Sequence, residues 1–339
     1  MYTVRAAVIL AVLLTGCVTE VKFDFDPDRV TAQWPDERPD RPPGELLIVS
    51  FPGQSALLGR HQVSRKTVTF IPAFPLLAGE RYQAQVPGQS PVLFSIPSVD
   101  APAPRLTGIH PSTDVLPANH LKFYLHFSES MEQGNIFRHF KLSDDSGQAV
   151  PEPFRETELW SADEKRLTLW LHPGRQKTGV NLNRDLGPVL NPGQTYTLTI
   201  SGRWKSQAGK PLGANHTKTF RALPPDRTQP DPAQWQLVPP PANTRTPLIL
   251  QLNEPLDWAL LQNQITVENI PGQTQVTRAE REWRFVPDAP WPPGEHRLLI
   301  GWELEDLAGN NLERPFEVDL QNAPPHGLAQ PRRVQFFVK

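Results

Sequence analysis

The chain has 339 residues, a formal net charge of -2 and 38% hydrophobic residues. This length allows two or three domains, and a charge so close to zero gives no electrostatic reason to expect a nucleic acid partner. The 39 prolines, about twice the usual share of ~5%, favour short strands joined by stiff turns and exclude a protein built of long helices.

The N-terminus carries a secretion signal with a lipid attachment site. An apolar run from Ala6 to Leu14 is too short to span a bilayer, and it ends in Leu14-Thr15-Gly16-Cys17, which resembles the lipobox of bacterial lipoproteins. The resemblance implies lipidation (palmitate) of Cys17, the single cysteine, and an outer-membrane location because Val18 rather than Asp follows it. An ordinary signal peptide with a chance cysteine is the alternative.

Three stretches of the chain repeat an ordered pattern of short β-strand signals. An alternating strand comes first, a strand and a Pro/Ala-Gly turn follow, and a further strand starts after that turn. The alternation is clearest where Leu121, Phe123, Leu125 and Phe127 fall on one face of a period-two strand, with Lys122 on the other face. Short strands separated by regular turn signals are typical of β-sandwiches. We therefore predict an all-β protein of three tandem antiparallel β-sandwiches.

Proline-rich linkers divide the predicted segments and should be semi-stiff. The segments are a signal peptide (1–16), a lipid-anchored spacer (17–44), a degenerate first repeat (45–97), a second repeat (105–223), a third repeat (233–321) and a C-terminal tail (322–339). We expect Pro315–Leu320 to form the closing strand of the third repeat. The tail carries one more strand signal, which adds either to its own chain or to another protein.

The second repeat resembles the bacterial Ig-like domain of the S-layer-protein type. The matching motifs are the opening Ile109–Pro117, the F-S-E-x-M-D turn at Phe127–Glu132 and the A-G-N-x-L exit at Ala208–Leu212, with equivalents of the last two at Leu252–Asp257 and Asp306–Leu312. The resemblance implies tandem Ig-like domains with a role as a modular scaffold. Its motifs are structural, so no catalytic residue carries over. The first repeat departs from the pattern, because Phe51-Pro52-Gly53 replaces the acidic turn.

The second repeat contains a long loop, 172–193, that the other two repeats lack. Loops longer than ~12–15 residues are uncommon in compact domains and are often functional. Trp170, at the start of the loop, should point away from the core, where it could stack on a sugar or contact a partner, and the basic side chains of the loop suit an anionic group. The candidate ligand- or partner-binding residues are Trp170, His172, Arg175, Lys177, Asn183 and Arg184. The alternative is a structural decoration that covers a sheet edge.

No motif of a catalytic, cofactor or metal site stands out. The G-x-S-x-G elbow, the H-E-x-x-H zinc motif, the P-loop and the dinucleotide fingerprint are absent from the sequence. We therefore predict no enzymatic activity, no catalytic residue, no cofactor and no metal. Glu129 and Glu254 are predicted to cap the turns that follow their strands, and an unrecognised active site built from Glu129, Glu156 or Glu158 is the alternative.

The stretch around Asp306 has two interpretations. Asp306, Asn310 and Asn311 can form a turn in which Asp and Asn side chains bond their own backbone. The same oxygens could instead bind calcium. The first interpretation is favoured, and the second stays open.

These features predict a non-enzymatic lipoprotein of the cell envelope that is held at a membrane by its lipid anchor. It would act as an adhesion, scaffold or assembly module, with an envelope protein or a cell-wall polymer as partner and no nucleic acid. The alternative function is a carbohydrate- or peptidoglycan-binding module that uses Trp170 and the 172–190 loop.

Overall fold

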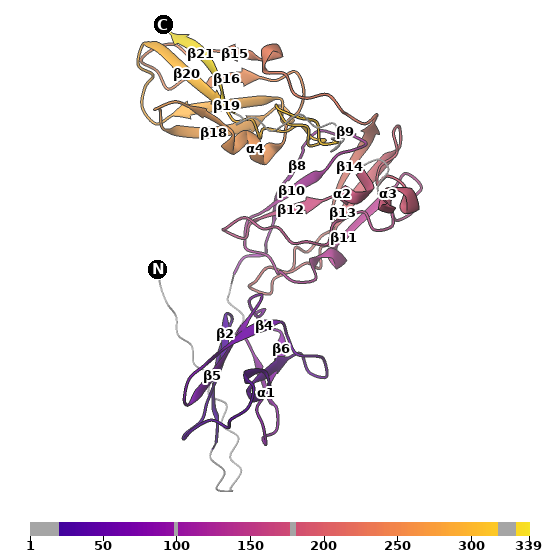
Figure 1. Ribbon diagram of the computed structural model, residues 1–339, viewed down its shortest axis with the longest axis vertical. Coiled ribbons are helices and arrows are strands. Elements are labelled where there is room, and N and C mark those ends of the chain that lie inside the picture. Colours follow the sequence, from indigo (N-terminus) through magenta and orange to yellow (C-terminus); the bar gives the residue numbers. More distant parts are fainter. Residues whose placement is uncertain (1–19, 98–100, 177–180, 318–329) are drawn as a thin grey trace. The chain divides into compact units, whose positions relative to one another are not determined.

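The computed structural model describes residues 20–97, 101–176, 181–317 and 330–339. These residues form six β-sheets with four short α-helices (Figure 1), which confirms the predicted all-β fold with antiparallel sheets. The chain divides into two compact units. Unit 1 comprises 1–104, 129–136 and 202–213, and unit 2 comprises 105–128, 137–201 and 214–339. Within the described ranges, no helix is both long enough and apolar enough to cross a membrane. The predicted signal peptide and Cys17 lie outside them.

Unit 1 contains a sandwich of two sheets with the strand orders β1-β2-β5-β4 and β3-β6-β7. The elements are β1 Lys22–Asp26, β2 Arg29–Gln33, α1 Pro43–Leu46, β3 Ile48–Ser50, β4 Gly59–Val63, β5 Thr67–Pro72, β6 Arg81–Gln85 and β7 Val92–Ser95. Alternate residues of both sheets, among them Val30 and Ala32 in β2 and Tyr82 and Ala84 in β6, belong to one buried cluster. The two sheets therefore close over a shared core.

The first sandwich begins earlier than the sequence predicted. Strands β1 and β2, which fall in the predicted spacer 17–44, pair with each other, and β2 also pairs with β5. Phe23 and Phe25 pack against the buried cluster that contains Val30. The alternating residues before Glu45 thus form part of the core, and without β2 one edge of β5 would be unpaired.

Two loops outside the first repeat also belong to unit 1. The backbone N–H of Ala78 donates to the carbonyl of Gln207, and the ammonium group of Lys205 forms an ion pair with Glu80. The backbone of Gly209 lies so close to Ala78 that an added Cβ would meet the carbonyl oxygen of Ala78 at 2.3 Å. Glycine is therefore required at 209 for this contact, as well as for its positive φ of 77°.

Unit 2 begins with the sandwich of the second repeat, whose sheets have the orders β12-β10-β8 and β11-β13-β14-β9. The elements are β8 Leu106–His110, β9 Val115–Pro117, β10 Lys122–Phe127, the 3-10 helix η1 Ile136–His139, β11 Phe140–Asp144, β12 Arg166–Trp170, α2 Pro173–Gln176, α3 Asn181–Leu186, β13 Thr195–Ile200 and β14 His216–Leu223. All pairs are antiparallel except β9 with β14. The predicted inward residues of β10 are buried, and the rings of Phe123 and Phe220 lie 5.6 Å apart across the core.

The third repeat forms a second sandwich in unit 2, with the orders β15-β16-β19-β18 and β17-β20-β21. The elements are the 3-10 helix η2 Pro232–Gln234, β15 Gln236–Val238, β16 Leu248–Gln251, α4 Trp258–Asn263, β17 Ile265–Val267, β18 Gly272–Thr277, β19 Glu282–Pro287, β20 Gly294–Ile300 and β21 Arg332–Val338. Trp283, Leu298 and Phe336 share its buried cluster.

The strand that completes the third sandwich differs from the predicted one. Residues 315–317 are not in a strand, and the rest of the predicted strand Pro315–Leu320 lies outside the described residues. Strand β21, from the predicted tail, pairs instead with β20 over seven residues and places Phe336 and Val338 in the core. The strand signal of the tail therefore serves its own chain.

Candidate functional site

The long loop of the second repeat folds onto its sandwich around one buried arginine. The Arg175 side chain is 2% exposed. Its guanidinium donates to the carbonyls of Gly187 at 2.9 Å and Pro188 at 2.8 Å, and also to those of Pro151 and Glu152 on the segment between β11 and β12. Burial lowers the pKa of Arg175, and the charge of Glu152 partly opposes that effect. This cation therefore holds two pieces of backbone together and does not contribute to a basic surface.

The other predicted loop residues lie in different settings. His172 Nδ1 accepts the backbone N–H of Gly174 at 3.1 Å, and the Asn183 amide donates to the backbone carbonyl of Arg175 at 2.5 Å. Arg184 is exposed, and Lys177 lies outside the described residues. The described members of the predicted set thus do not converge on one ligand position, and their role in binding stays a prediction.

Trp170 points away from the core of its sandwich, as predicted, but it is half-buried. The Lys122 ammonium group lies 5.0 Å from the centre of its ring, a cation–π distance. The indole N–H is buried and has no hydrogen-bond partner among the residues that the structure describes. Trp170 therefore contributes to a packed region rather than to an open sugar-stacking platform.

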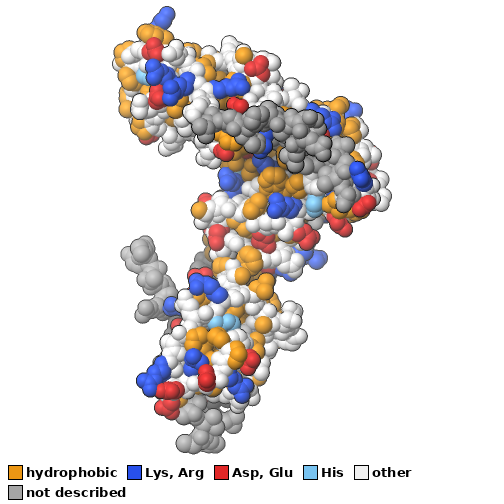
Figure 2. Space-filling view, viewed as in Figure 1, with side chains coloured by type: hydrophobic (Ala, Val, Ile, Leu, Met, Phe, Trp, Pro, Cys, Tyr) orange, Lys and Arg blue, Asp and Glu red, His pale blue; other side chains and the backbone are white. Residues whose placement is uncertain are grey.

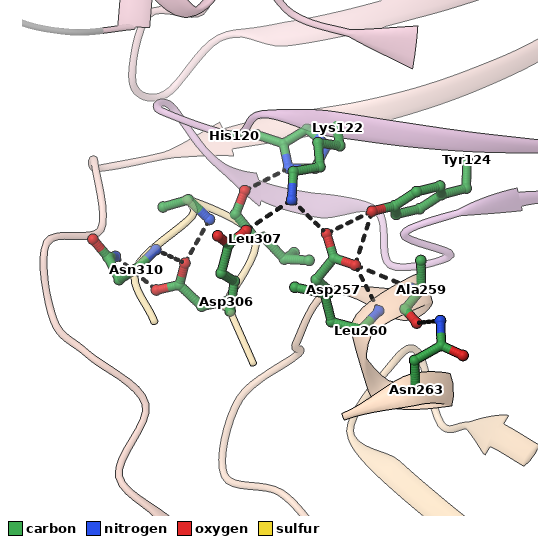
Figure 3. A network of polar contacts seen from close by, with 12 residues as sticks. His120, Lys122, Tyr124, Asp257, Ala259, Leu260, Asn263, Asp306, Leu307 and Asn310 are labelled. Carbon is green, nitrogen blue, oxygen red and sulfur yellow. Dashed lines mark hydrogen bonds and ion pairs between the residues drawn. The ribbon is translucent and has the colours of Figure 1, made fainter. Parts of the chain in front are cut away.

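Lys122 and Tyr124, on the outer face of β10, contact the third sandwich through a buried polar network, shown in Figure 3. The Lys122 ammonium group lies 3.1 Å from Asp257 and 2.7 Å from Glu305. The Tyr124 hydroxyl donates to the Asp257 carboxylate at 2.7–2.8 Å. Asp257 is 4% exposed and also accepts two backbone N–H groups in the first turn of α4 at 3.0 Å, so it caps that helix.

The surroundings of Lys122 and Tyr124 favour the protonated form of both side chains. Burial lowers the pKa of Lys122, but Asp257 and Glu305 raise it by more, so the amine stays protonated. Burial and the neighbouring Asp257 together raise the pKa of Tyr124, which keeps the hydroxyl available as a donor. Trp258 of α4 adds apolar contact, with its ring 4.8 Å from that of His110.

A second contact joins the same two sandwiches. The turn between β18 and β19 places Arg278, Ala279 and Glu280 at φ values of 51°, 54° and 62°, a left-handed conformation that costs about 1–2 kcal/mol per residue. Glu280 is 1% exposed. Its carboxylate lies 2.7 Å from His110 Nδ1 and accepts the backbone N–H of Ser112 at 2.9–3.0 Å. The strained turn thus holds the Glu280 carboxylate in hydrogen-bonding contact with the second sandwich.

The predicted turn at Asp306 is present. Its carboxylate accepts the backbone N–H groups of Ala308 at 2.8 Å and Asn310 at 2.9 Å. The amide oxygen of Asn310 accepts from Phe316, and that of Asn311 accepts from Arg314. Both asparagine oxygens are therefore engaged by backbone N–H groups, as the turn interpretation predicts.

Two other carboxylates lie beside this turn, and the sequence analysis did not connect them. Asp226, Glu254 and Asp306 each have a ligand oxygen within 4.8 Å of the others. Burial raises the pKa of Asp306 to about 7, with Asp226 adding to that effect, and raises the pKa of Glu254 to about 7. Carboxylates so placed can share protons or bind a hard divalent cation such as Ca²⁺. Glu254 therefore lies in an acidic cluster, and Asp257, rather than Glu254, caps the element that follows β16.

An aromatic groove of about 570 Å³ lies on the second sandwich, beside the start of the long loop. It runs between β11 and the segment that leads from β11 to β12. Its lining includes Phe137, Phe140, Phe154, Glu152, Glu156 and His172. Of the predicted binding residues, only His172 reaches it. The sequence signal for the groove was the spacing of three phenylalanines and two glutamates within 20 residues.

No protein-family model matches the chain, and no curated protein matches its sequence. Among solved structures, the FN1–FN3 domains of chicken CNTN1 are similar with a TM-score of 0.20 and 9% identity, over 94% of this chain and 98% of that one. The S-layer protein rSbsC(31–844) has a TM-score of 0.19 and 10% identity, over 81% of this chain and 51% of that chain, so this chain spans about half of its length.

A further similar structure is SGBP-B of the Bacteroides ovatus mixed-linkage glucan utilization locus, solved in complex with a mixed-linkage heptasaccharide. Its TM-score is 0.20 at 14% identity, over 76% of this chain and 55% of that chain. The class of the protein is defined by its own sheets: an all-β chain of antiparallel sandwiches, two of which share a buried polar contact.

Proposed function

We propose that the chain is a non-enzymatic scaffold of the cell envelope, in which the two sandwiches of unit 2 act as one rigid body. The observation that carries this proposal is the network of Lys122, Tyr124 and Asp257. A flexible joint would leave these charges in water, whereas a buried ion pair tolerates little movement because separation leaves an uncompensated charge.

The rest of the proposed role follows the sequence. Lipidation of Cys17 would hold the protein at a membrane, and stable attachment requires at least two acyl chains. An outer-membrane location and an envelope protein as partner belong to the same proposal. Acidic and basic side chains are mixed over the face drawn in Figure 2, which fits a partner other than nucleic acid.

The rigid body can be tested by distance measurement. Spin labels are attached at Asp145→Cys in the second sandwich and Gln335→Cys in the third, in a chain that also carries Cys17→Ser. Pulsed electron paramagnetic resonance should give a single narrow distribution of distances between the two labels, and Lys122→Ala should broaden that distribution. A broad distribution in the chain with an intact network would refute the rigid body.

The anchor has its own test in cells. Labelled palmitate should enter the wild-type protein, and the Cys17→Ser variant should leave the membrane fraction. If the variant stayed membrane-bound, the lipid anchor would be ruled out.

The scaffold role itself is tested by crosslinking from Arg184 in cells, which should capture the same envelope protein repeatedly. Capture of cell-wall polymer would favour the alternative binding function.

A further inference from the structure

The aromatic groove of the second sandwich has a composition that the rigid body does not require. Phe154 forms its buried part, while Phe137 and Phe140 remain half-exposed. Half-exposed aromatic rings around a cavity within the usual ~300–1,000 Å³ range are the common lining of ligand sites. The groove is therefore a candidate binding site, and His172 is the one member of the predicted set that lines it.

We propose that this groove binds an apolar peptide segment with a lysine or arginine side chain, contributed by a partner protein. The inference rests on the proposed scaffold role, because it specifies the chemistry of the partner. The first argument is the ring arrangement. Phe137 and Phe140 lie 6.5 Å apart with 60° between their planes, and Phe140 and Phe154 lie 6.1 Å apart with 69°. Rings inclined to one another can surround an apolar chain or a cation, whereas a sugar stacks best on one flat platform.

The second argument is charge. Glu152 and Glu156 are exposed, and neither has a salt-bridge partner within the described part of the chain. The Lys141 ammonium group donates to the carbonyl of Gly147 at 3.4 Å, and His172 uses Nδ1 as an acceptor. The lining thus carries two carboxylates against the single ammonium group of Lys141, and this excess of negative charge favours a cationic ligand over an anionic one.

The third argument explains what the long loop does. Glu152 has a φ of 40°, in the left-handed region that a glutamate rarely adopts. The buried Arg175 guanidinium donates to the backbone carbonyl of Glu152 and to that of the preceding residue, Pro151. Arg175 thereby holds the backbone that presents the Glu152 carboxylate at the groove. In this arrangement Arg175 is a positioning residue, and His172 is the one described residue of the loop that lines the groove.

A fluorescence anisotropy titration of the full chain tests the proposal. The probes are a labelled hexapeptide with two arginines and four apolar residues, its counterpart with two glutamates, and cellohexaose as an unlabelled competitor. We expect the arginine peptide to bind at least about tenfold more tightly than the glutamate peptide. The double variant Glu152→Gln/Glu156→Gln should remove this preference, and Asp145→Asn, an exposed carboxylate of the same sandwich, should leave it unchanged.

Three outcomes would overturn the proposal: equal binding of both peptides, an unchanged preference in the double variant, or displacement of the arginine peptide by cellohexaose. Arg175→Lys keeps the charge but cannot reach the same set of carbonyls. It should weaken the arginine peptide about tenfold while the circular dichroism spectrum stays unchanged. If the peptide does not bind and the spin-label distance is single and narrow, the groove proposal is refuted and the rigid body is retained. If the peptide binds and the distance distribution is broad, the rigid body alone is refuted.

Discussion

Replacing Lys122 with methionine removes the cation that pairs with both Asp257 and Glu305 between the two sandwiches of unit 2. Methionine keeps the apolar stem that lies near Trp170 and deletes the charge. Asp257 would then remain buried, and Glu305 partly buried, without their counter-ion. Removal of one partner of a buried ion pair costs about 3–5 kcal/mol. The side chain of Glu305 is 25% exposed and can regain water, so we expect a loss near 3 kcal/mol.

Urea denaturation at pH 7, followed by tryptophan fluorescence, measures this loss as a lower transition midpoint at constant slope. Lys141→Met is the matched control, since Lys141 is exposed on β11 and should change stability by no more than about 0.5 kcal/mol. Adding Asp257→Asn to Lys122→Met should recover about 1–2 kcal/mol, because asparagine still caps α4 and no longer leaves a buried charge. A loss below about 1 kcal/mol for Lys122→Met, as at an exposed pair, would refute the reasoning.

Three further predictions concern other parts of unit 2. The folded-state pKa of Asp306, about 7, exceeds its ordinary value of 3.8, so the stabilisation from its protonated form is complete below pH 4 and is lost as the pH rises to 7. Urea titrations should show Asp306→Asn flattening this decline, by at most about 4 kcal/mol, and parallel curves for the two proteins would contradict the shift. Arg175→Ala should cost about 3 kcal/mol or more, read from thermal melts, because five backbone carbonyls lose their donor; a melt within 1 °C of the wild type would exclude that role. Gly309→Ala should cost about 1–3 kcal/mol, because its φ is 84° and the added methyl would meet Leu121 at 2.4 Å; an unchanged urea midpoint would show that the loop relaxes freely.

Local patterns accounted for most of the strands but not for the surfaces between sandwiches. The period-two alternation of β10 identified Phe123 and Leu125 as core residues, because that signal depends only on neighbouring positions. The same alternation placed Lys122 on the outer face, but not its partner Asp257, which lies 135 residues further along. Tyr124 is buried although it lies on that outer face, because the third sandwich covers it.

The candidate site shows the same limit. The loop 172–193 was identified as unusual from its length, yet its most prominent cation, Arg175, is an internal hydrogen-bond donor. A sequence does not reveal whether a loop arginine faces water or backbone carbonyls, because that depends on how the loop folds back. The phenylalanines of the groove were present in the sequence, but their approach to His172 depends on how the connection between β11 and β12 crosses the sandwich.

Strand β21 has a consequence for how the third sandwich comes to be made. Because a protein is synthesised from its N-terminus, β20 is made before β21, the strand that pairs with it. The two strands are separated by 31 residues, between Ile300 and Arg332. Until β21 arrives, one edge of β20 is unpaired and the core lacks Phe336 and Val338. An open edge of this kind is a site for unwanted strand pairing. The third sandwich is therefore complete only once β21 has been synthesised.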